Sequence, residues 1–305
     1  MCSRFIALNF LLLLALPEFT RGQATSPTPT SDAANLTGLT TPIDVDFSDH
    51  RILSGSGFFY MEFGPDDPTT KGPHWRTITH LYVVTAKHLI QPKRLRDLVK
   101  LTYAMRSANG EKVEWLRFDL NGEELGKRLH VCKREEIDVA VIDVTGDLAT
   151  QMKQPLAQRA QLLSFNGASA DEFPGKSPLE VQPGDDVIVI GYPQGFYDQY
   201  NKLPILKTGL LNTPINLHFD GLDAFLIDFK YYEGSSGSLI ISKPSHFGFS
   251  KDGLLQTSEV RRYVFLGVYQ GEWYRNEDQS LGADLGLGWY YYNVEEAIKN
   301  PPLAH

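Results

Sequence analysis

Two adjacent serines lie between glycines in the segment GSSGS, residues 234–238. The apolar run AFLIDF comes shortly before this segment, and SLII follows its last glycine. Both runs have the length and the β-branched or aromatic content of strands, so the segment is a turn between strands rather than a flexible connector. The flanking glycines allow main-chain N–H groups to turn toward a bound substrate, as the chemistry of a nucleophilic serine requires.

A serine hydroxyl becomes a nucleophile when a base takes its proton and a carboxylate orients that base. His88 ends the apolar segment YVVTAKH, and Asp138 lies at the start of the apolar segment IDVAVIDV. Either residue alone is more often structural: a histidine at a strand end is usually a surface residue, and an acid before a strand is usually a turn residue. Together with Ser236, they supply the three groups that the chemistry requires.

These three segments resemble the motifs of trypsin-like serine proteases, and they occur in the order His, Asp, Ser that this family has. The resemblance implies that Ser236 is the nucleophile, His88 the general base and Asp138 the carboxylate that orients the imidazole. It also implies an oxyanion hole formed by the main-chain N–H groups of Gly234 and Ser236. The expected fold class is all-β, with two perpendicular six-stranded β-barrels of the chymotrypsin type and a short C-terminal helix.

Three further segments are similar to those of bacterial Deg-type peptidases, so that the resemblance covers about residues 46–298. They are GSGFF at 55–59, VQPGDDVIVIGYPQG at 181–195 and FLGVYQG at 265–271. Ser238 differs from the glycine that the family often has there, and Ser235 replaces the aspartate with which digestive trypsins bind a newly freed N-terminus. No IVGG-like start is present, so we do not expect activation by cleavage. We also expect no PDZ module within this chain.

Four residues are candidates for substrate binding. Lys230 lies six residues before Ser236, where digestive trypsins have the base of their primary pocket. A lysine pointing into that pocket would favour an acidic substrate side chain; alternatively, it is an exposed lysine paired with Asp228 or Glu233. Tyr269, Gln270 and Gly271 resemble the strand along which family members bind substrate main chain. The side chains of Tyr269 and Gln270 are then either pocket wall or uninvolved.

The order of short apolar runs and turn signals divides the chain into four parts. We expect a signal peptide at 1–24, a flexible tether at 25–42, a first barrel with the interbarrel connection at 43–165, and a second barrel with a terminal helix at 166–305. The segment Asp147 to Leu163 is expected to include a helix between the barrels. In NVEEAIKN near the end, Asn293 and Glu296 have the spacing of a capping box, and Pro301 follows.

The N-terminus has the pattern of a secretory signal: a basic residue, a short apolar run, and then small residues. We therefore expect an exported protein, secreted or periplasmic, with no stable membrane insertion after cleavage; an uncleaved anchor is the alternative. Cys2 falls in this signal, which leaves Cys132 alone and without a disulfide partner in the mature chain. We expect Cys132 to be a buried structural thiol.

The formal net charge is −8, and the sequence KRLR is the one short basic cluster. A nucleic-acid partner is not expected, because binding phosphates requires a concentrated basic face. No metal-binding or nucleotide-binding motif is present in a suitable context, so no metal or cofactor is expected. The sequence predicts an exported serine endopeptidase acting on proteins or peptides through an acyl-enzyme. The alternatives are a catalytically silent binding protein with a protease fold, and an esterase on the same fold.

Overall fold

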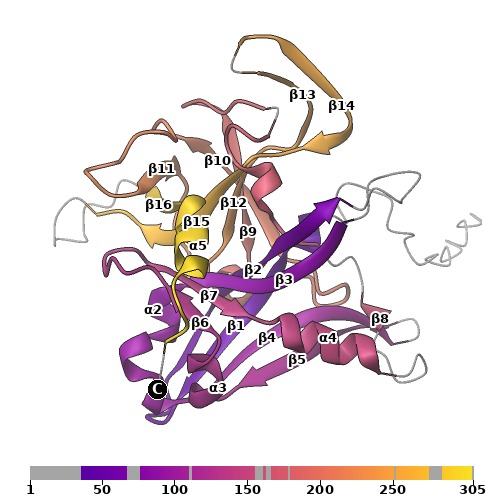
Figure 1. Cartoon of the computed structure of the whole chain (residues 1–305). Coiled ribbons are helices and arrows are strands. Elements are labelled where there is room, and N and C mark those ends of the chain that lie inside the picture. The colour runs from indigo at the N-terminus through magenta and orange to yellow at the C-terminus, as the bar shows by residue number, and fades with distance from the viewer. Residues whose placement is uncertain are drawn as a thin grey trace, which may run out of the picture.

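A computed structural model of the chain describes residues 36–66, 76–109, 112–154, 161–162, 166–177, 179–250, 252–274 and 284–303. The predicted signal peptide and residues 25–35 of the predicted tether lie outside these ranges. The described chain forms an eight-stranded N-terminal sheet and a closed six-stranded barrel that lie against each other (Figure 1). The expected fold class, all-β with a C-terminal helix, is confirmed.

The N-terminal sheet has the strand order β5-β4-β1-β2-β3-β7-β6, and β8 pairs with β4. It thus has eight strands instead of the expected six. Burial alternates along β1, where Ile43, Val45 and Phe47 face the core and the aspartates between them do not. The strands are β1 Thr40–Phe47, β2 Ile52–Asp66, β3 Arg76–Ala86, β4 Leu98–Asn109, β5 Lys112–Leu120, β6 Leu129–Val131, β7 Val139–Asp143 and β8 Gln161–Leu162.

The C-terminal half forms a closed barrel in the order β10-β11-β16-β15-β12-β9. Its strands β11 and β12 are short, continuous apolar runs, and most of their residues are buried. A two-stranded sheet, β13–β14, projects from this barrel (Figure 1). The strands are β9 Asp186–Gly191, β10 Ile205–Leu211, β11 Ala224–Asp228, β12 Leu239–Ser242, β13 Ser245–Phe249, β14 Leu255–Arg262, β15 Phe265–Glu272 and β16 Leu285–Tyr290.

One hydrophobic cluster joins the sheet to the barrel. It contains Phe58 and Val84 from the sheet together with Leu239 and Phe265 from the barrel. The rings of Phe58 and Phe265 meet edge to face, with 5.4 Å between their centroids. Side chains placed at the edges of the two β-structures along this junction are therefore held at fixed relative positions.

Two predicted boundaries shift in the structure. β1 begins at Thr40, inside the predicted tether, because Leu39 is fully buried and the Thr41 hydroxyl accepts a hydrogen bond from the main-chain N–H of Ala104. Ala168, in the range predicted for the second barrel, forms an isolated bridge with β2 of the N-terminal sheet, since its main chain exchanges hydrogen bonds with Phe59 and Met61. These main-chain bonds cannot be inferred from composition.

The helices are short: α2 Lys87–Ile90, η1 Pro92–Asp97, α3 Gly122–Gly126, α4 Thr145–Lys153, η2 Ala170–Glu172, η3 Pro193–Gly195 and α5 Tyr292–Lys299. The helix expected between the two halves is present as α4. Within the described ranges, no helix has the length and apolar content needed to cross a membrane.

The terminal helix is confirmed as α5, but its predicted capping box is wrong. The N-cap residue is Tyr291, which makes no side-chain capping bond. Asn293 lies inside the helix and is fully buried, and its amide nitrogen donates to the main-chain oxygen of Asp223 at 3.0 Å. Tertiary burial has therefore taken the side chain that local spacing assigns to the cap. Cys132 is buried as predicted, and its thiol donates to the carbonyl of Asn293.

Candidate functional site

The register of two neighbouring strands brings His88 and Asp138 together. β3 pairs with β7 so that Ala86 lies opposite Val139, which places the residues just beyond these strand ends side by side. His88 Nδ1 lies 2.6 Å from Asp138 Oδ2, and the main-chain N–H of His88 donates to the other carboxylate oxygen at 2.7 Å. Asp138 is only 8% exposed. The carboxylate thus fixes the imidazole orientation and leaves the other ring nitrogen free, as a general base requires.

Ser236 lies in the tight turn that leads into β12. The main-chain N–H of Ser235 donates to Tyr232 O, and that of Ser238 donates to Ser235 O. Ser238 also accepts a hydrogen bond from Tyr269 N, and it is almost fully buried. The departure from the family pattern at Ser238 is therefore accommodated without opening the turn.

The two glycines of the turn adopt a backbone conformation that other residues rarely take. The φ angles of Gly234 and Gly237 are both +82°. A Cβ atom at Gly237 would lie 2.1 Å from Ser56 O and 2.4 Å from the Thr85 hydroxyl. Glycine is therefore required at Gly237 both for its φ and for the close approach of the N-terminal sheet.

The turn leaves two main-chain N–H groups without an acceptor. Glu233 O accepts from Gln194 N, and Ser235 O accepts from Ser238 N. In a trans peptide the N–H points opposite to the carbonyl, so the N–H groups of Gly234 and Ser236 point away from those partners. Neither donates a hydrogen bond within the described part of the chain, although both residues are buried. Buried N–H groups are rarely unpaired, and these two are available to an oxyanion.

Ser56 of β2 connects the N-terminal sheet to this turn, and it was not among the residues predicted for the site. Its hydroxyl donates to Gly234 O at 2.9 Å and accepts from Tyr192 N at 2.8 Å. Its main-chain N–H donates to Ser236 O, and its own carbonyl accepts from the Thr85 hydroxyl at 2.7 Å. Position between glycines in GSGFF was the one available signal. Ser56 holds the two halves of the site in place relative to each other.

The Ser236 hydroxyl is not directed at His88. It donates to the main-chain oxygen of Gln270 at 2.8 Å, and no hydrogen bond joins it to the imidazole among the described residues. Gln270 lies at a register shift between β15 and β16, where a bulged residue is left out of regular pairing. Burial raises the pKa of the nearby Tyr231 hydroxyl, while its hydrogen bond with Ser236 acts in the opposite direction. The hydroxyl of Ser236, the predicted nucleophile, is thus bound to Gln270 in this structure.

The three residues predicted to line the substrate strand have different roles. The main-chain N–H of Tyr269 donates to Ser238 O, and its carbonyl accepts from Gly237 N, both in the turn that bears Ser236. The ring of Tyr269 is buried in the barrel core. The main-chain N–H and carbonyl of Tyr269 are therefore both hydrogen-bonded within the protein, and its role in substrate binding stays a prediction. Gln270 presents its carbonyl beside Ser236. Gly271 follows on the same strand, and a Cβ there would lie 3.8 Å from the Tyr231 ring.

Lys230 is exposed and forms no ion pair with Asp228 or Glu233 in the described structure. Its predicted contact with an acidic substrate side chain stays a prediction. A different lysine packs against the segment before the nucleophile: Lys207 Nζ of β10 lies 3.5 Å from the ring centroid of Tyr232 and 4.9 Å from that of Phe229. These are cation–π contacts that the sequence did not indicate.

Comparison with known proteins gives structural likeness only. No protein-family model and no curated protein matches the chain. The active form of the Rv3671c protease from M. tuberculosis is 15% identical, with a TM-score of 0.42, and the match covers 88% of this chain and 83% of that one. The HtrA-type protease AlgW is 12% identical, with a TM-score of 0.44 and coverage of 86% and 60%.

A scabies mite inactivated protease paralogue is also similar, at 13% identity, with a TM-score of 0.46 and coverage of 88% and 96%. Solved structures that resemble this chain thus include both active and inactivated proteases. At these identities and scores the likeness carries no evidence about activity, and the function must be judged from the site itself. Within the described residues, no three or more His, Cys, Asp or Glu side chains are grouped to hold a metal ion.

Proposed function

We propose that this protein is a serine endopeptidase that cleaves peptide bonds through an acyl-enzyme. The observation that carries this proposal is the doubly hydrogen-bonded pair of the exposed His88 and the buried Asp138, together with a turn that bears Ser236 and two N–H groups that are unpaired within the described residues. An ordinary Gly/Ser turn needs neither a neighbouring His–Asp pair nor unpaired buried donors. Acyl transfer requires both.

In the proposed mechanism, substrate binding releases the Ser236 hydroxyl from its hydrogen bond with the Gln270 carbonyl. A substrate strand alongside β15 would place a main-chain N–H where it can bind the Gln270 carbonyl, which now accepts from the serine hydroxyl. Rotation about χ1 then moves Ser236 Oγ from Gln270 toward His88. His88 takes the hydroxyl proton, Oγ attacks the carbonyl carbon, and the N–H groups of Gly234 and Ser236 stabilise the oxyanion. The protonated His88 gives its proton to the leaving amine, and water then hydrolyses the acyl-enzyme.

A second candidate is a protease-fold binding protein without catalysis. The observation in its favour is the same hydrogen bond, because a serine bound to Gln270 cannot pass its proton to His88. An esterase on the same fold uses the same groups and differs only in the substrate. The N-terminal signal pattern leads us to expect that any of these functions is exerted outside the cytoplasm.

A fluorophosphonate probe distinguishes catalysis from binding. We expect covalent labelling of the wild-type chain and none of Ser236→Ala. The matched control is Ser235→Ala, the neighbouring serine of the same turn, which should be labelled like the wild type. Equal labelling of Ser236→Ala would eliminate Ser236 as the nucleophile, and no labelling of any variant would favour the binding protein. Cleavage of a peptide library, compared with hydrolysis of activated esters, then separates peptidase from esterase.

A further inference from the structure

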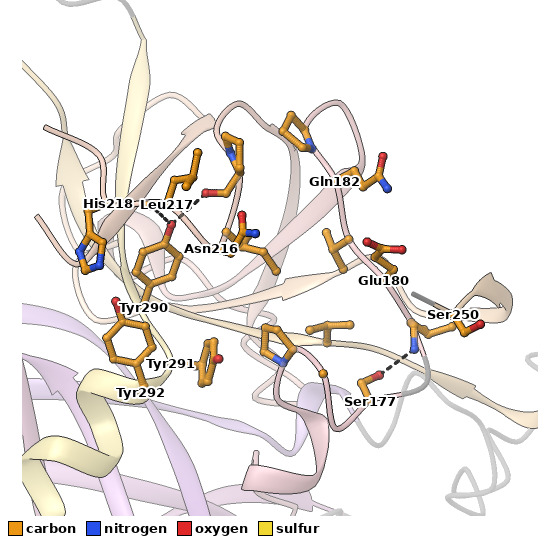
Figure 2. Close-up of a pocket in the computed structure, with 18 of the residues that line it drawn as sticks. Ser177, Glu180, Gln182, Asn216, Leu217, His218, Ser250, Tyr290, Tyr291 and Tyr292 are labelled. Carbon is orange, nitrogen blue, oxygen red and sulfur yellow. Dashed lines mark hydrogen bonds between the residues drawn. The ribbon is translucent and has the colours of Figure 1, made fainter. Parts of the chain in front are cut away.

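The second barrel contains a cavity of about 900 Å³ that has no residue in common with the candidate active site. Its walls come from residues 174, 175, 177 and 179–183, the loop 214–218 and the end of β16 with the start of α5 (Figure 2). Ligand pockets in proteins have volumes of about 300–1,000 Å³. The cavity is thus of ligand size, and the proposed peptidase mechanism makes no use of it.

The cavity has an aromatic wall and an apolar floor. Tyr290, Tyr291 and Tyr292 stand side by side at one end, and the Tyr290 hydroxyl donates to the carbonyls of Pro214 and Leu217 in the facing loop (Figure 2). The remaining apolar contacts come from side chains such as Val181 and Ile215. These hydrogen bonds fix the loop against the tyrosines, so the cavity is held open by the fold.

The charge of the cavity is of one sign. Among the described residues that line it, the carboxylates are Glu180, Asp223 and Asp252, and none is a lysine or an arginine. Asp223 is buried and already paired with Arg134 and His218. Glu180 and Asp252 are exposed and have no ion-pair partner in the described structure. An anionic ligand would meet unbalanced repulsion here, whereas a cationic group would gain two carboxylates and the tyrosine faces.

A second hollow of about 760 Å³ lies along β13 and has residues 179–182 and Ser250 in common with the cavity. Phe247 and Phe249 line it and are 63% and 61% exposed, and Leu217 beside the cavity is 60% exposed. Exposed apolar side chains grouped around hollows mark interaction surfaces. Because the two hollows share residues 179–182 and Ser250, they adjoin each other on the surface of the protein.

We propose that these two hollows form a second binding site for a polypeptide segment in which lysine or arginine alternates with apolar residues. The apolar side chains pack on Phe247, Phe249 and Leu217, and the cationic groups lie near Glu180, Asp252 and the tyrosines. The proposal adds a recognition site whose lining residues do not include Ser236, His88 or Asp138, and it does not depend on catalysis. A peptidase with this site would select proteins by a basic, apolar segment as well as by the bond that it cleaves.

Fluorescence anisotropy with the full chain carrying Ser236→Ala tests the proposal, because that variant cannot cleave the probe by the proposed mechanism. The probes are three labelled ten-residue peptides with identical leucine and valine positions, in which every other residue is lysine, glutamine or glutamate. We expect saturable binding of the lysine peptide and at least about tenfold weaker binding of the glutamate peptide. Exposed ion pairs each contribute little binding free energy, so the double variant Glu180→Gln with Asp252→Asn should weaken binding of the lysine peptide only about three- to tenfold.

Two further variants make the test specific. Glu136→Gln with Glu259→Gln removes the same charge from exposed positions outside both hollows and should leave binding unchanged. Asn216→Trp fills the cavity from its exposed loop and should weaken binding at least about tenfold, with an unchanged circular dichroism spectrum. The proposal is overturned by equal binding of all three peptides, by equal weakening in the control double variant, by unchanged binding in both cavity variants, or by no binding up to about millimolar peptide.

The test of the second binding site can fail or succeed independently of the test of the proposed peptidase activity. Anisotropy reports binding in a chain without the nucleophile, and fluorophosphonate labelling reports the nucleophile in a chain without peptide. Peptide binding in the absence of labelling would retain the second site and reject the peptidase, and the reverse result would do the opposite.

Discussion

The hydroxyl of Ser56 offers the sharpest test of how the site is held together. Replacing Ser56 with alanine removes one oxygen atom and changes nothing else in the side chain. That oxygen accepts from Tyr192 N and donates to Gly234 O, and all three residues are buried. The substitution therefore leaves one N–H and one carbonyl without their partner.

The expected loss follows from those two groups. A buried polar group left unpaired costs about 1–3 kcal/mol, so the loss of partners for two such groups in Ser56→Ala should lower the free energy of unfolding by about 2–6 kcal/mol. Small domains have only about 5–15 kcal/mol in total, which makes this a large effect. The Gly234 carbonyl belongs to the turn that bears Ser236, so we also expect the rate of fluorophosphonate labelling to fall at least about tenfold, equivalent to about 1.4 kcal/mol.

Urea unfolding monitored by tryptophan fluorescence measures the first effect, and timed probe labelling measures the second. The matched control is Ser54→Ala on the same strand, whose exposed hydroxyl donates to Asp44. It should change the free energy of unfolding by no more than about 0.5 kcal/mol. If Ser56→Ala were as mild as Ser54→Ala in both assays, Ser56 would not connect the sheet to the turn in the way that the hydrogen bonds indicate.

Three other outcomes are expected. Asp138→Asn should slow fluorophosphonate labelling by about 10³- to 10⁴-fold without unfolding the chain, since the imidazole loses its orienting carboxylate; a near-normal rate would separate Asp138 from the chemistry. Burial raises the pKa of the Cys132 thiol to about 12, so iodoacetamide at pH 8 should modify it only after unfolding in urea, and rapid reaction of the native chain would contradict its burial. Burial also raises the pKa of Glu172 above its unfolded value, so its contribution to stability is present at low pH and is lost as the pH rises through the folded pKa. The free energy of unfolding of the wild type, relative to that of Glu172→Gln, should therefore fall from about pH 4 to pH 8. If the two proteins lost stability in parallel over this range, the loss would not come from Glu172.

The chain's local pattern carried much of the fold and the main groups of the site. Apolar runs of strand length between turn signals predicted the β-structure. A strand buried on one face alternates apolar and polar residues, and a strand buried on both faces is a continuous apolar run. The same pattern of apolar runs and turn signals indicated the strand ends that carry His88 and Asp138, and the glycines that form the turn around Ser236. These residues are recognisable because their chemistry demands particular residue types next to particular strand ends.

Other features depend on contacts between residues far apart in the chain. The number of strands in the N-terminal sheet, the start of β1 and the burial of Asn293 follow from packing partners that no local window contains. The same holds for Ser56, whose hydroxyl binds Gly234 across 178 positions of sequence. Tyr269 illustrates the limit most clearly: its place on the predicted strand is as expected, but its main chain is occupied by the nucleophile turn.

The sequence by itself thus determined the residue types and strand-end positions from which a nucleophile, a base and an orienting acid are predicted, since these are local properties. Only the tertiary structure decided that the Ser236 hydroxyl donates to the Gln270 carbonyl and that two N–H groups have no acceptor within the described residues. It alone placed the tyrosines and free carboxylates around one cavity. Hydrogen bonding and burial depend on the positions of both partners in space, and these are set only when the sheet and the barrel pack together.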